Sequence, residues 1–127
     1  MIYFLKIAFY FLISILIVLS LFPGSLLGLF FYNDIGQQPD LIENPFGTAI
    51  NHFISYFCIS ILGLFAYLRT DKFNLILYKL FFLSTILEIL HFFIPNRAFE
   101  LIDLAGNFLG VLVAYFLIKI YLLIIKP

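Results

Sequence analysis

Four long apolar runs constrain the fold of this chain more than any other feature of its sequence. A transmembrane helix needs about 20 mostly apolar residues, and the segments that meet this length are residues 3–22, 50–68, 73–94 and 102–125. Three of the runs end at helix-breaking or charged residues, namely Pro23-Gly24, Arg69-Thr70-Asp71-Lys72 and Pro95-Asn96-Arg97. The sequence therefore predicts an all-α fold in which residues 1–127 form one domain, a four-helix transmembrane bundle with a long loop at residues 24–49.

The composition agrees with a lipid-embedded chain and argues against a soluble domain. Of the 127 residues, 65% are hydrophobic and 11% are charged, whereas a soluble domain carries about 25% charged residues. Seven basic residues balance seven acidic ones, so no charge excess points to a nucleic-acid partner. Cys58 is the only cysteine, which excludes an intrachain disulfide, and we expect it to be a small buried apolar residue.

The first apolar run is expected to stay in the protein as a membrane span. It is longer than the apolar part of a typical signal peptide, and the sequence SLFPGSLLG at its end has no A-x-A cleavage motif. The loop that follows begins with the apolar segment LLGLFF at residues 26–31. We expect this segment to lie in the membrane interface as a short amphipathic or re-entrant piece.

The distribution of Lys and Arg predicts the orientation of the spans. The loop at residues 24–49 contains three acidic residues and no basic one, whereas the loop at 69–72 contains Arg69 and Lys72. In a four-span layout the remaining lysines fall on the side of the 69–72 loop, either directly or by snorkelling: Lys6, Lys79, Lys119 and Lys126. Both termini are therefore predicted to be cytoplasmic (N-in/C-in).

Helical spacing places the polar residues of the spans on shared faces. Residues three, four and seven apart lie on one side of a helix. On the fourth span this side carries Asp103 and Asn107 with the small residues Gly106, Gly110 and Ala114, a spacing that lets another helix approach closely. On the second span the shared face carries His52, Ser55, Ile59, Gly63 and Ala66. On the third span it carries Ser84, Glu88 and His91.

These three faces are expected to look at one another. An ionised side chain facing lipid near the membrane centre costs about 3 kcal/mol or more, and an inward position allows it to be paired. The sequence therefore predicts a small bundle with a polar mouth at its outer end. The residues expected to line this mouth are His52, Glu88, His91, Arg97, Asp103 and Asn107, while Gly63, Gly106, Gly110 and Ala114 are expected to pack the helices.

The spacing of the polar residues resembles the signature of the VanZ-like family of small bacterial membrane proteins. Glu88-x-x-His91, Pro95-x-Arg97 and Asp103-x-x-x-Asn107-x-x-Gly110 are similar to the family's E-x-x-Q, Pro-x-Arg and D-x-x-x-N-x-x-G, and His52-Phe53-x-x-Tyr56 is similar to its H-F-x-x-Y/F. His91 replaces the glutamine, and Thr48-Ala49-Ile50-Asn51 stands where the family usually has an Asp-Lys pair. The resemblance covers about residues 48–118. It implies a multi-pass protein of the bacterial inner (plasma) membrane with a link to the cell envelope, and no specific reaction.

The polar cluster has several interpretations at this stage. Glu88, Arg97 and Asp103 fit a structural ion-pair network that fixes the helix register. They also fit a pocket for the head group of an anionic lipid or lipid-linked ligand, with Arg97 as a bidentate anion ligand. A metal site built from His52, Glu88, His91 and Asp103 is a weaker interpretation, because the family pattern has glutamine in place of His91. We expect no metal and no cofactor.

Catalysis is not expected from these residues. A hydrolase needs a nucleophile beside a base, and Ser84 lies at least one helical turn deeper in the membrane than His91. The expected partners are membrane lipids. In the alternative, the chain is a non-catalytic accessory subunit packed on a larger membrane complex, or a homo-oligomer. Its small size and apolar exterior motivate that alternative, and the sequence leaves both open.

Overall fold

The computed structural model describes residues 2–125 and consists of helices joined by loops. In chain order the elements are α1 (Ile2–Leu21), α2 (Leu26–Tyr32), α3 (Ala49–Ala66), α4 (Phe73–Leu90), the 3-10 helix η1 (His91–Phe93) and α5 (Leu101–Ile124). Four helices are long and apolar enough to cross a membrane: α1, α3, α4 continued by η1, and α5. The predicted all-α class is confirmed, and these helices mark the chain as a multi-span membrane protein.

The four long helices coincide with the predicted apolar runs to within about one helical turn. The largest difference lies at the end of the third run, where α4 stops at Leu90 and a 3-10 turn continues to Phe93. Ile94 is extended there, with φ −98° and ψ 126°, because Pro95 disfavours the helical conformation for the residue before it. His91 therefore sits at the junction where α4 gives way to the tighter turn.

The predicted loop at residues 24–49 contains the short helix α2, which covers the segment expected to be interfacial. Ser25 caps its start, because Oγ accepts a hydrogen bond from the backbone N–H of Gly28 at 2.9 Å. Asn33 ends the helix in the left-handed conformation at φ 55°. A Cβ at Gly28 would collide with the backbone oxygens of Asp34 and Gln37, so the chain folds back closely over α2.

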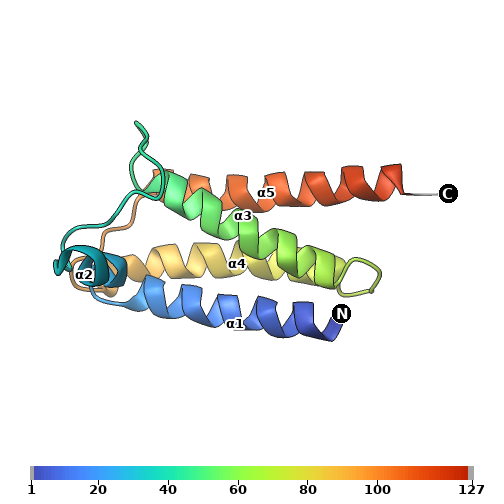
Figure 1. Cartoon of the computed structure of the whole chain (residues 1–127), viewed down its shortest axis with the longest axis horizontal. Helices are drawn as coiled ribbons and strands as arrows, with labels where there is room; N and C mark the ends of the chain where they lie inside the picture. Colours follow the sequence, from blue (N-terminus) through green and yellow to red (C-terminus); the bar gives the residue numbers. More distant parts are fainter. Residues whose placement is uncertain (1, 126–127) are drawn as a thin grey trace.

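The two ends of the bundle differ in what they contain (Figure 1). The start of α1, the end of α5 and the turn between α3 and α4 lie at one end, which we call the terminal end. At the opposite end, here the α2 end, α2 and the loop after it lie near the segment that joins η1 to α5. The helix α3 packs against α1, α4 and α5. The fold therefore brings residues 24–48 and 91–100 to the same end.

The small residues of α5 lie against the backbone of α3. A Cβ at Gly106 would be 2.5 Å from the carbonyl oxygen of Ala49, and one at Gly110 would be 2.5 Å from that of Phe53. Ala114, one turn further, is fully buried. The spacing of these three residues predicted a close helix contact, and the structure places that contact within one molecule, between α3 and α5. Gly63 has a different neighbour, since a Cβ there would collide with the ring of Phe9 on α1.

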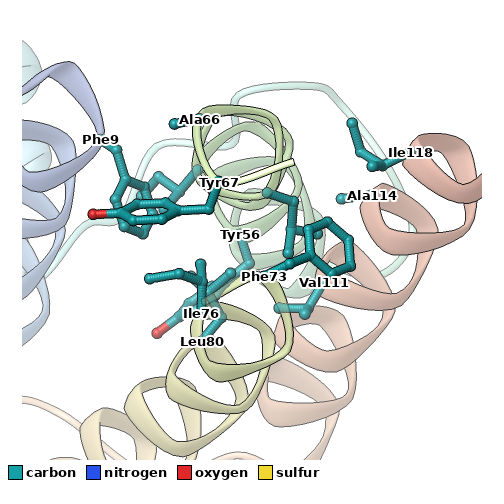
Figure 2. Close-up of a cluster of buried hydrophobic side chains, with 12 residues drawn as sticks. Phe9, Tyr56, Ala66, Tyr67, Phe73, Ile76, Leu80, Val111, Ala114 and Ile118 are labelled. Carbon is teal, nitrogen blue, oxygen red and sulfur yellow. The ribbon is translucent and has the colours of Figure 1, made fainter. Parts of the chain in front are cut away.

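A hydrophobic cluster fills the bundle toward the terminal end (Figure 2). Phe9 is its contribution from α1, and Tyr67 connects to α1 through a 3.0 Å hydrogen bond between its hydroxyl and that of Tyr10. The ammonium of Lys6 lies 4.7 Å from the centre of the Tyr67 ring, and that of Lys119 lies 5.5 Å from the centre of the Phe73 ring. Cations of α1 and α5 therefore cover this cluster from the terminal end.

The outer surface of the bundle is largely apolar. Phe4, Phe82 and Phe116 are each more than half exposed, on three different helices. Cys58 is also exposed, on the outside of α3, so the expectation that it is buried is wrong. Its neighbours Tyr56 and Ile59 occupy the buried face instead. Side chains of this kind suit contact with lipid tails.

Candidate functional site

Two adjoining hollows open at the α2 end of the bundle. The first has a volume of about 100 Å³ and reaches between the helices, and the second has a volume of about 180 Å³ and lies among the loops. Each of the six residues predicted to form the polar mouth lines at least one of these hollows. The residues that line both are Ser25, Gln38, His52, His91 and Arg97. We call the two hollows together the outer pocket.

One wall of the outer pocket joins α3 to α5 through His52. Its Nδ1 lies 3.0 Å from Oδ1 of Asn107, and its Nε2 lies 3.5 Å from Oδ2 of Asp103. Thr48, at the start of α3, donates a hydrogen bond to the Asp103 carboxylate, with 3.2 Å to either oxygen. The Asp103 side chain therefore has neighbours on α3 that satisfy its oxygens, as a buried carboxylate requires.

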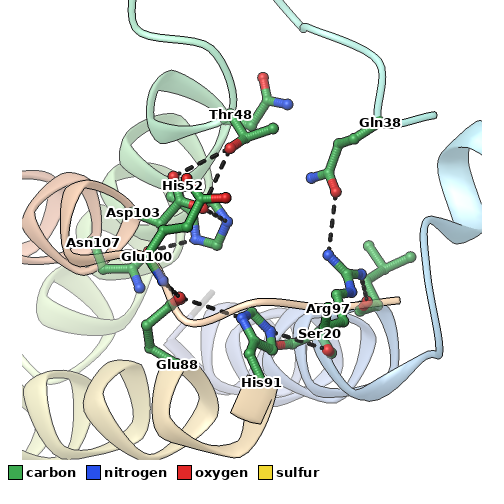
Figure 3. A network of polar contacts seen from close by, with 12 residues as sticks. Ser20, Gln38, Thr48, His52, Glu88, His91, Arg97, Glu100, Asp103 and Asn107 are labelled. Carbon is green, nitrogen blue, oxygen red and sulfur yellow. Dashed lines mark hydrogen bonds and ion pairs between the residues drawn. The ribbon is translucent and has the colours of Figure 1, made fainter. Parts of the chain in front are cut away.

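A second wall joins α4 to α1 through His91 (Figure 3). Nδ1 of His91 lies 3.3 Å from Oε1 of Glu88, three residues earlier on the same face. On the other side of the ring, Nε2 lies 3.1 Å from the hydroxyl of Ser20 and 3.2 Å from its backbone oxygen. Oε1 of Glu88 also accepts the backbone N–H of Glu100 at 3.1 Å. Both Glu88 and His91 are almost fully buried.

Arg97 lies beside the end of α1, and its side chain contacts neutral oxygens. Nη2 donates to the carbonyl of Leu19 at 2.7 Å, Nε donates to that of Phe22 at 3.3 Å, and Nη1 donates to Oε1 of Gln38 at 3.1 Å. The last carbonyls of a helix have no partner within it, which explains why an arginine is held there. Burial lowers the pKa of the Arg97 guanidinium, while the carboxylates of Glu88 and Asp103 raise it.

The structure revises the expected ion-pair network. Within residues 2–125, the carboxylates of Glu88 and Asp103 contact the imidazoles of His91 and His52, and neither carboxylate pairs directly with Arg97. The acidic residues are therefore arranged as two carboxylate–histidine pairs, one between α3 and α5 and one at the end of α4. Arg97 belongs to the contact with α1. Its charge is left without an adjacent carboxylate.

Several residues of the site carried no signal in the sequence. Ser20 is a single serine in an apolar span, Thr48 precedes a helix, and Gln38 lies in a loop, all common positions for these residue types. Asn51 ties the loop to α3, because it accepts the N–H of Leu41 at 2.9 Å and donates to the carbonyl of Pro39 at 2.8 Å. Each becomes recognisable only when the loop and the helices are placed together.

Of the two serines on the polar faces of α3 and α4, Ser55 lines the pocket and Ser84 does not. Ser55 lines the deeper hollow. The hydroxyl of Ser84 donates to the carbonyl of Phe81 in its own helix at 2.8 Å. Its hydrogen bond is therefore made to the helix backbone and not to His91. In the described part of the chain, no group of three or more His, Cys, Asp or Glu residues is arranged to hold a metal ion.

The outer pocket thus combines an apolar interior with imidazoles, carboxylates and one arginine. Such a site can bind an amphiphilic molecule that carries an anionic group, and it can move protons through the two histidines. Comparison of the chain with protein-family models, with curated proteins and with solved structures finds no match.

Proposed function

We propose that this chain is a VanZ-like membrane protein of the bacterial cell envelope whose outer pocket binds the anionic head group of a lipid or lipid-linked molecule. The observation that carries the proposal is the position of Arg97. Its side chain lines both hollows of the pocket and contacts only neutral oxygens among residues 2–125. A partly buried cation with no adjacent carboxylate in the described part of the chain is a natural partner for a phosphate or carboxylate group.

The donors of Arg97 support this role. A guanidinium has five N–H groups, and the three hydrogen bonds to Leu19, Phe22 and Gln38 use three of them. Two N–H groups therefore remain for a ligand. The bonds to the carbonyls of Leu19 and Phe22 hold the side chain in place before a ligand arrives, which lowers the entropy lost on binding.

The shape of the pocket supports an amphiphilic ligand. The deeper hollow is lined on the α1 and α2 side by Leu16, Leu19, Leu26 and Leu27. The hollow among the loops is instead lined by polar groups, among them Asn96, Arg97 and Glu100. A molecule with an anionic head and an apolar chain matches this change from polar to apolar lining.

The resemblance to the VanZ-like family supports the same region. Four of the positions that carry it, Glu88, Arg97, Asp103 and Asn107, line the outer pocket. Where the family usually has an Asp-Lys pair, this chain has the segment beginning with Thr48, whose hydroxyl bonds Asp103. The ligand set of this chain is therefore expected to differ in detail from that of other members.

We propose that both termini are cytoplasmic and that the outer pocket faces the periplasmic or extracellular side. The terminal end gathers basic residues from three elements: Lys6 on α1, Arg69 and Lys72 in the turn after α3, and Lys119 on α5. The loop at the α2 end has acidic residues and no basic one. This asymmetry follows the positive-inside rule. Lys126, which also entered the topology prediction, lies outside the described residues.

Cysteine labelling in intact cells tests this orientation. In a Cys58→Ala background, Asp34→Cys is expected to react with a membrane-impermeant maleimide added outside, because Asp34 lies in the exposed loop at the α2 end. Asp71→Cys, in the exposed turn between α3 and α4, is expected to react only after the membrane is permeabilised. The reverse pattern would show that the pocket faces the cytoplasm.

Native mass spectrometry of protein extracted gently from its own membrane tests ligand binding. The wild-type protein is expected to carry a discrete lipid mass, and Arg97→Gln is expected to weaken that binding tenfold or more. A hydrogen bond to a charged group contributes about 1.5–3 kcal/mol, which is about one to two factors of ten in affinity. Arg69→Gln is the matched control, because Arg69 is exposed at the terminal end. Equal lipid occupancy in Arg97→Gln and the wild type would refute the proposal.

The same spectra test the alternative that the chain is an accessory subunit of a larger assembly. One observation favours it: Phe9 is the only residue of α1 that is buried, so most of this helix presents apolar side chains outward. In that case the chain is expected to migrate with other polypeptides, or with further copies of itself, at fixed stoichiometry. The outer pocket would then serve to hold the bundle together.

A further inference from the structure

Ser20, His91 and Glu88 form a chain of contacts across the wall of the outer pocket (Figure 3). The Ser20 hydroxyl lies 3.1 Å from Nε2 of His91, and Nδ1 of the same ring lies 3.3 Å from Oε1 of Glu88. A serine next to an imidazole that is oriented by a carboxylate is the arrangement that activates a serine as a nucleophile. From this geometry we propose that Ser20 is an acyl-accepting nucleophile and that the protein is an esterase acting on acylated anionic lipids.

The contact with Glu88 places a proton on Nδ1 of His91. Oε1 of Glu88 accepts the backbone N–H of Glu100 at 3.1 Å, so this oxygen is an acceptor, and the facing Nδ1 of His91 is the donor. In the neutral ring Nε2 then has a free lone pair that accepts the hydroxyl proton of Ser20. The backbone oxygen of Ser20, 3.2 Å from Nε2, can accept a hydrogen bond from that nitrogen once it is protonated.

The position of Ser20 in the pocket indicates the substrate class, and this step rests on the proposed head-group function. Ser20 lines the deeper hollow together with Leu16, Leu26 and Leu27. Arg97 lines the same hollow and bonds the carbonyls of Leu19 and Phe22, which flank Ser20 in the sequence. In an acylated anionic lipid the ester lies between the charged group and the chain, so a ligand held by Arg97 can bring its ester close to Ser20.

The reaction balances with water as the second reactant. Oγ of Ser20 bonds to the ester carbonyl carbon while its proton passes to Nε2 of His91. The bond from that carbon to the alcohol oxygen then breaks, and the leaving oxygen takes the proton from Nε2. Water attacks the acyl-serine by the same route, which releases a carboxylic acid and restores the serine hydroxyl. Ser20 and His91 are the catalytic residues, and Glu88 is a positioning residue.

A fluorophosphonate probe tests this inference on the full chain in mild detergent. The probe is expected to form a covalent adduct on Ser20, located by peptide mass analysis, with loss of fluoride. His91→Gln, which installs the residue of the family pattern, is expected to slow labelling by about 10²–10⁴-fold, the range of general-base catalysis. Ser14→Ala is the matched control, because Ser14 lies on the same helix and its hydroxyl bonds only the carbonyl of Tyr10 within it.

Glu88→Gln separates a positioning role from a structural one. Glutamine keeps an oxygen that can accept the N–H of Glu100, so the fold is expected to survive. Labelling is expected to show a lower maximal rate constant, kinact, with an unchanged probe affinity, KI. A structural role alone would change neither constant in the protein that remains folded.

Three outcomes would overturn the inference: no Ser20 adduct on folded wild-type protein, an adduct on Ser14 instead, or equal labelling rates in His91→Gln and the wild type. These outcomes are distinguishable from failure of the head-group proposal. A lipid that binds in an Arg97-dependent manner to a protein that the probe does not label would refute only the esterase. If the probe labels Ser20 in a protein that carries no bound lipid, the assignment of Ser20 as a nucleophile stands and only the lipid-binding proposal is refuted.

Discussion

Replacing Gly110 with leucine is expected to lower the free energy of unfolding by about 3 kcal/mol, at the upper end of the range for overpacked cores. Even a Cβ at this position would lie 2.5 Å from the carbonyl oxygen of Phe53 and 2.8 Å from the backbone nitrogen of Phe57. Both atoms belong to the backbone of α3, so no side-chain rotation relieves the contact. The helices α3 and α5 must separate, which disturbs the contacts of His52 with Asp103 and Asn107.

Thermal unfolding in detergent, followed by circular dichroism at helical wavelengths, measures this effect. Ala105→Leu is the matched control, because Ala105 lies on the exposed side of α5 near Gly106. Its unfolding free energy is expected to stay within about 0.5 kcal/mol of the wild type, as for most surface substitutions. Equal melting temperatures for Gly110→Leu and Ala105→Leu would mean that the close approach of α3 and α5 does not exist.

The sequence predicted the face of α5 that is packed, but not the neighbour of each small residue. The spacing of Gly106, Gly110 and Ala114 indicates a close helix contact, because only small residues recur there. It does not distinguish a contact within the chain from one between copies. Gly63 shows the same limit: it was grouped with these residues, yet its neighbour is the ring of Phe9 on α1.

The sequence predicts where the polar residues lie, but it predicts few of their hydrogen-bond partners. Helical periodicity brought Glu88 and His91 to one face, since the residues are three apart on one helix. Two of the three partners of Arg97 could not be derived, because they are the backbone oxygens of Leu19 and Phe22 around the end of α1, and any residue type provides such oxygens. Ser20 was missed for a related reason. Its importance depends on a distance to His91, which is 71 residues away in sequence.

The short helix α2 is only partly predictable from the sequence. Its apolar segment was expected in the membrane interface, and the helix could have been anticipated from its ends. Ser25 is a preferred residue before a helix, and Asn33 tolerates the left-handed conformation after one. What the sequence could not supply is the fold of the loop back onto α2, where Gly28 meets the backbone of Gln37. That fold brings Gln38 to Arg97.

The bonds of the outer pocket have a stability role whether or not a ligand binds. Asn51 fixes the loop after α2, Arg97 fixes the end of α1, and Asp103 joins α5 to α3. Variants at these positions can therefore lose ligand binding by losing structure. Substitutions that keep hydrogen-bonding capacity, such as Glu88→Gln, separate the two effects, whereas apolar substitutions measure the structural one.

Replacing Glu88 with leucine is accordingly expected to destabilise the protein by about 3 kcal/mol or more, the loss typical of removing one partner from a buried pair. Glu88 is 1% exposed, and its Oε1 is the acceptor for both Nδ1 of His91 and the backbone N–H of Glu100. Leucine of similar size removes the acceptor of both donors and leaves the buried Nδ1–H of His91 unpaired. Glu88→Gln retains one oxygen and is expected to unfold at a temperature closer to that of the wild type.

A double-mutant cycle with His91→Leu identifies the source of that loss. If buried unpaired groups are the cause, Glu88→Leu/His91→Leu is expected to be less destabilised than the sum of the two single variants, by about 0.5–3 kcal/mol. Two apolar side chains of similar size leave no unpaired imidazole, and such replacements of buried pairs are often nearly neutral. Strict additivity, measured by the same unfolding experiment, would instead indicate that Glu88 and His91 stabilise the bundle separately. In that case the hydrogen bond from Glu100, rather than the carboxylate–histidine pair, would be what holds the start of α5 against α4.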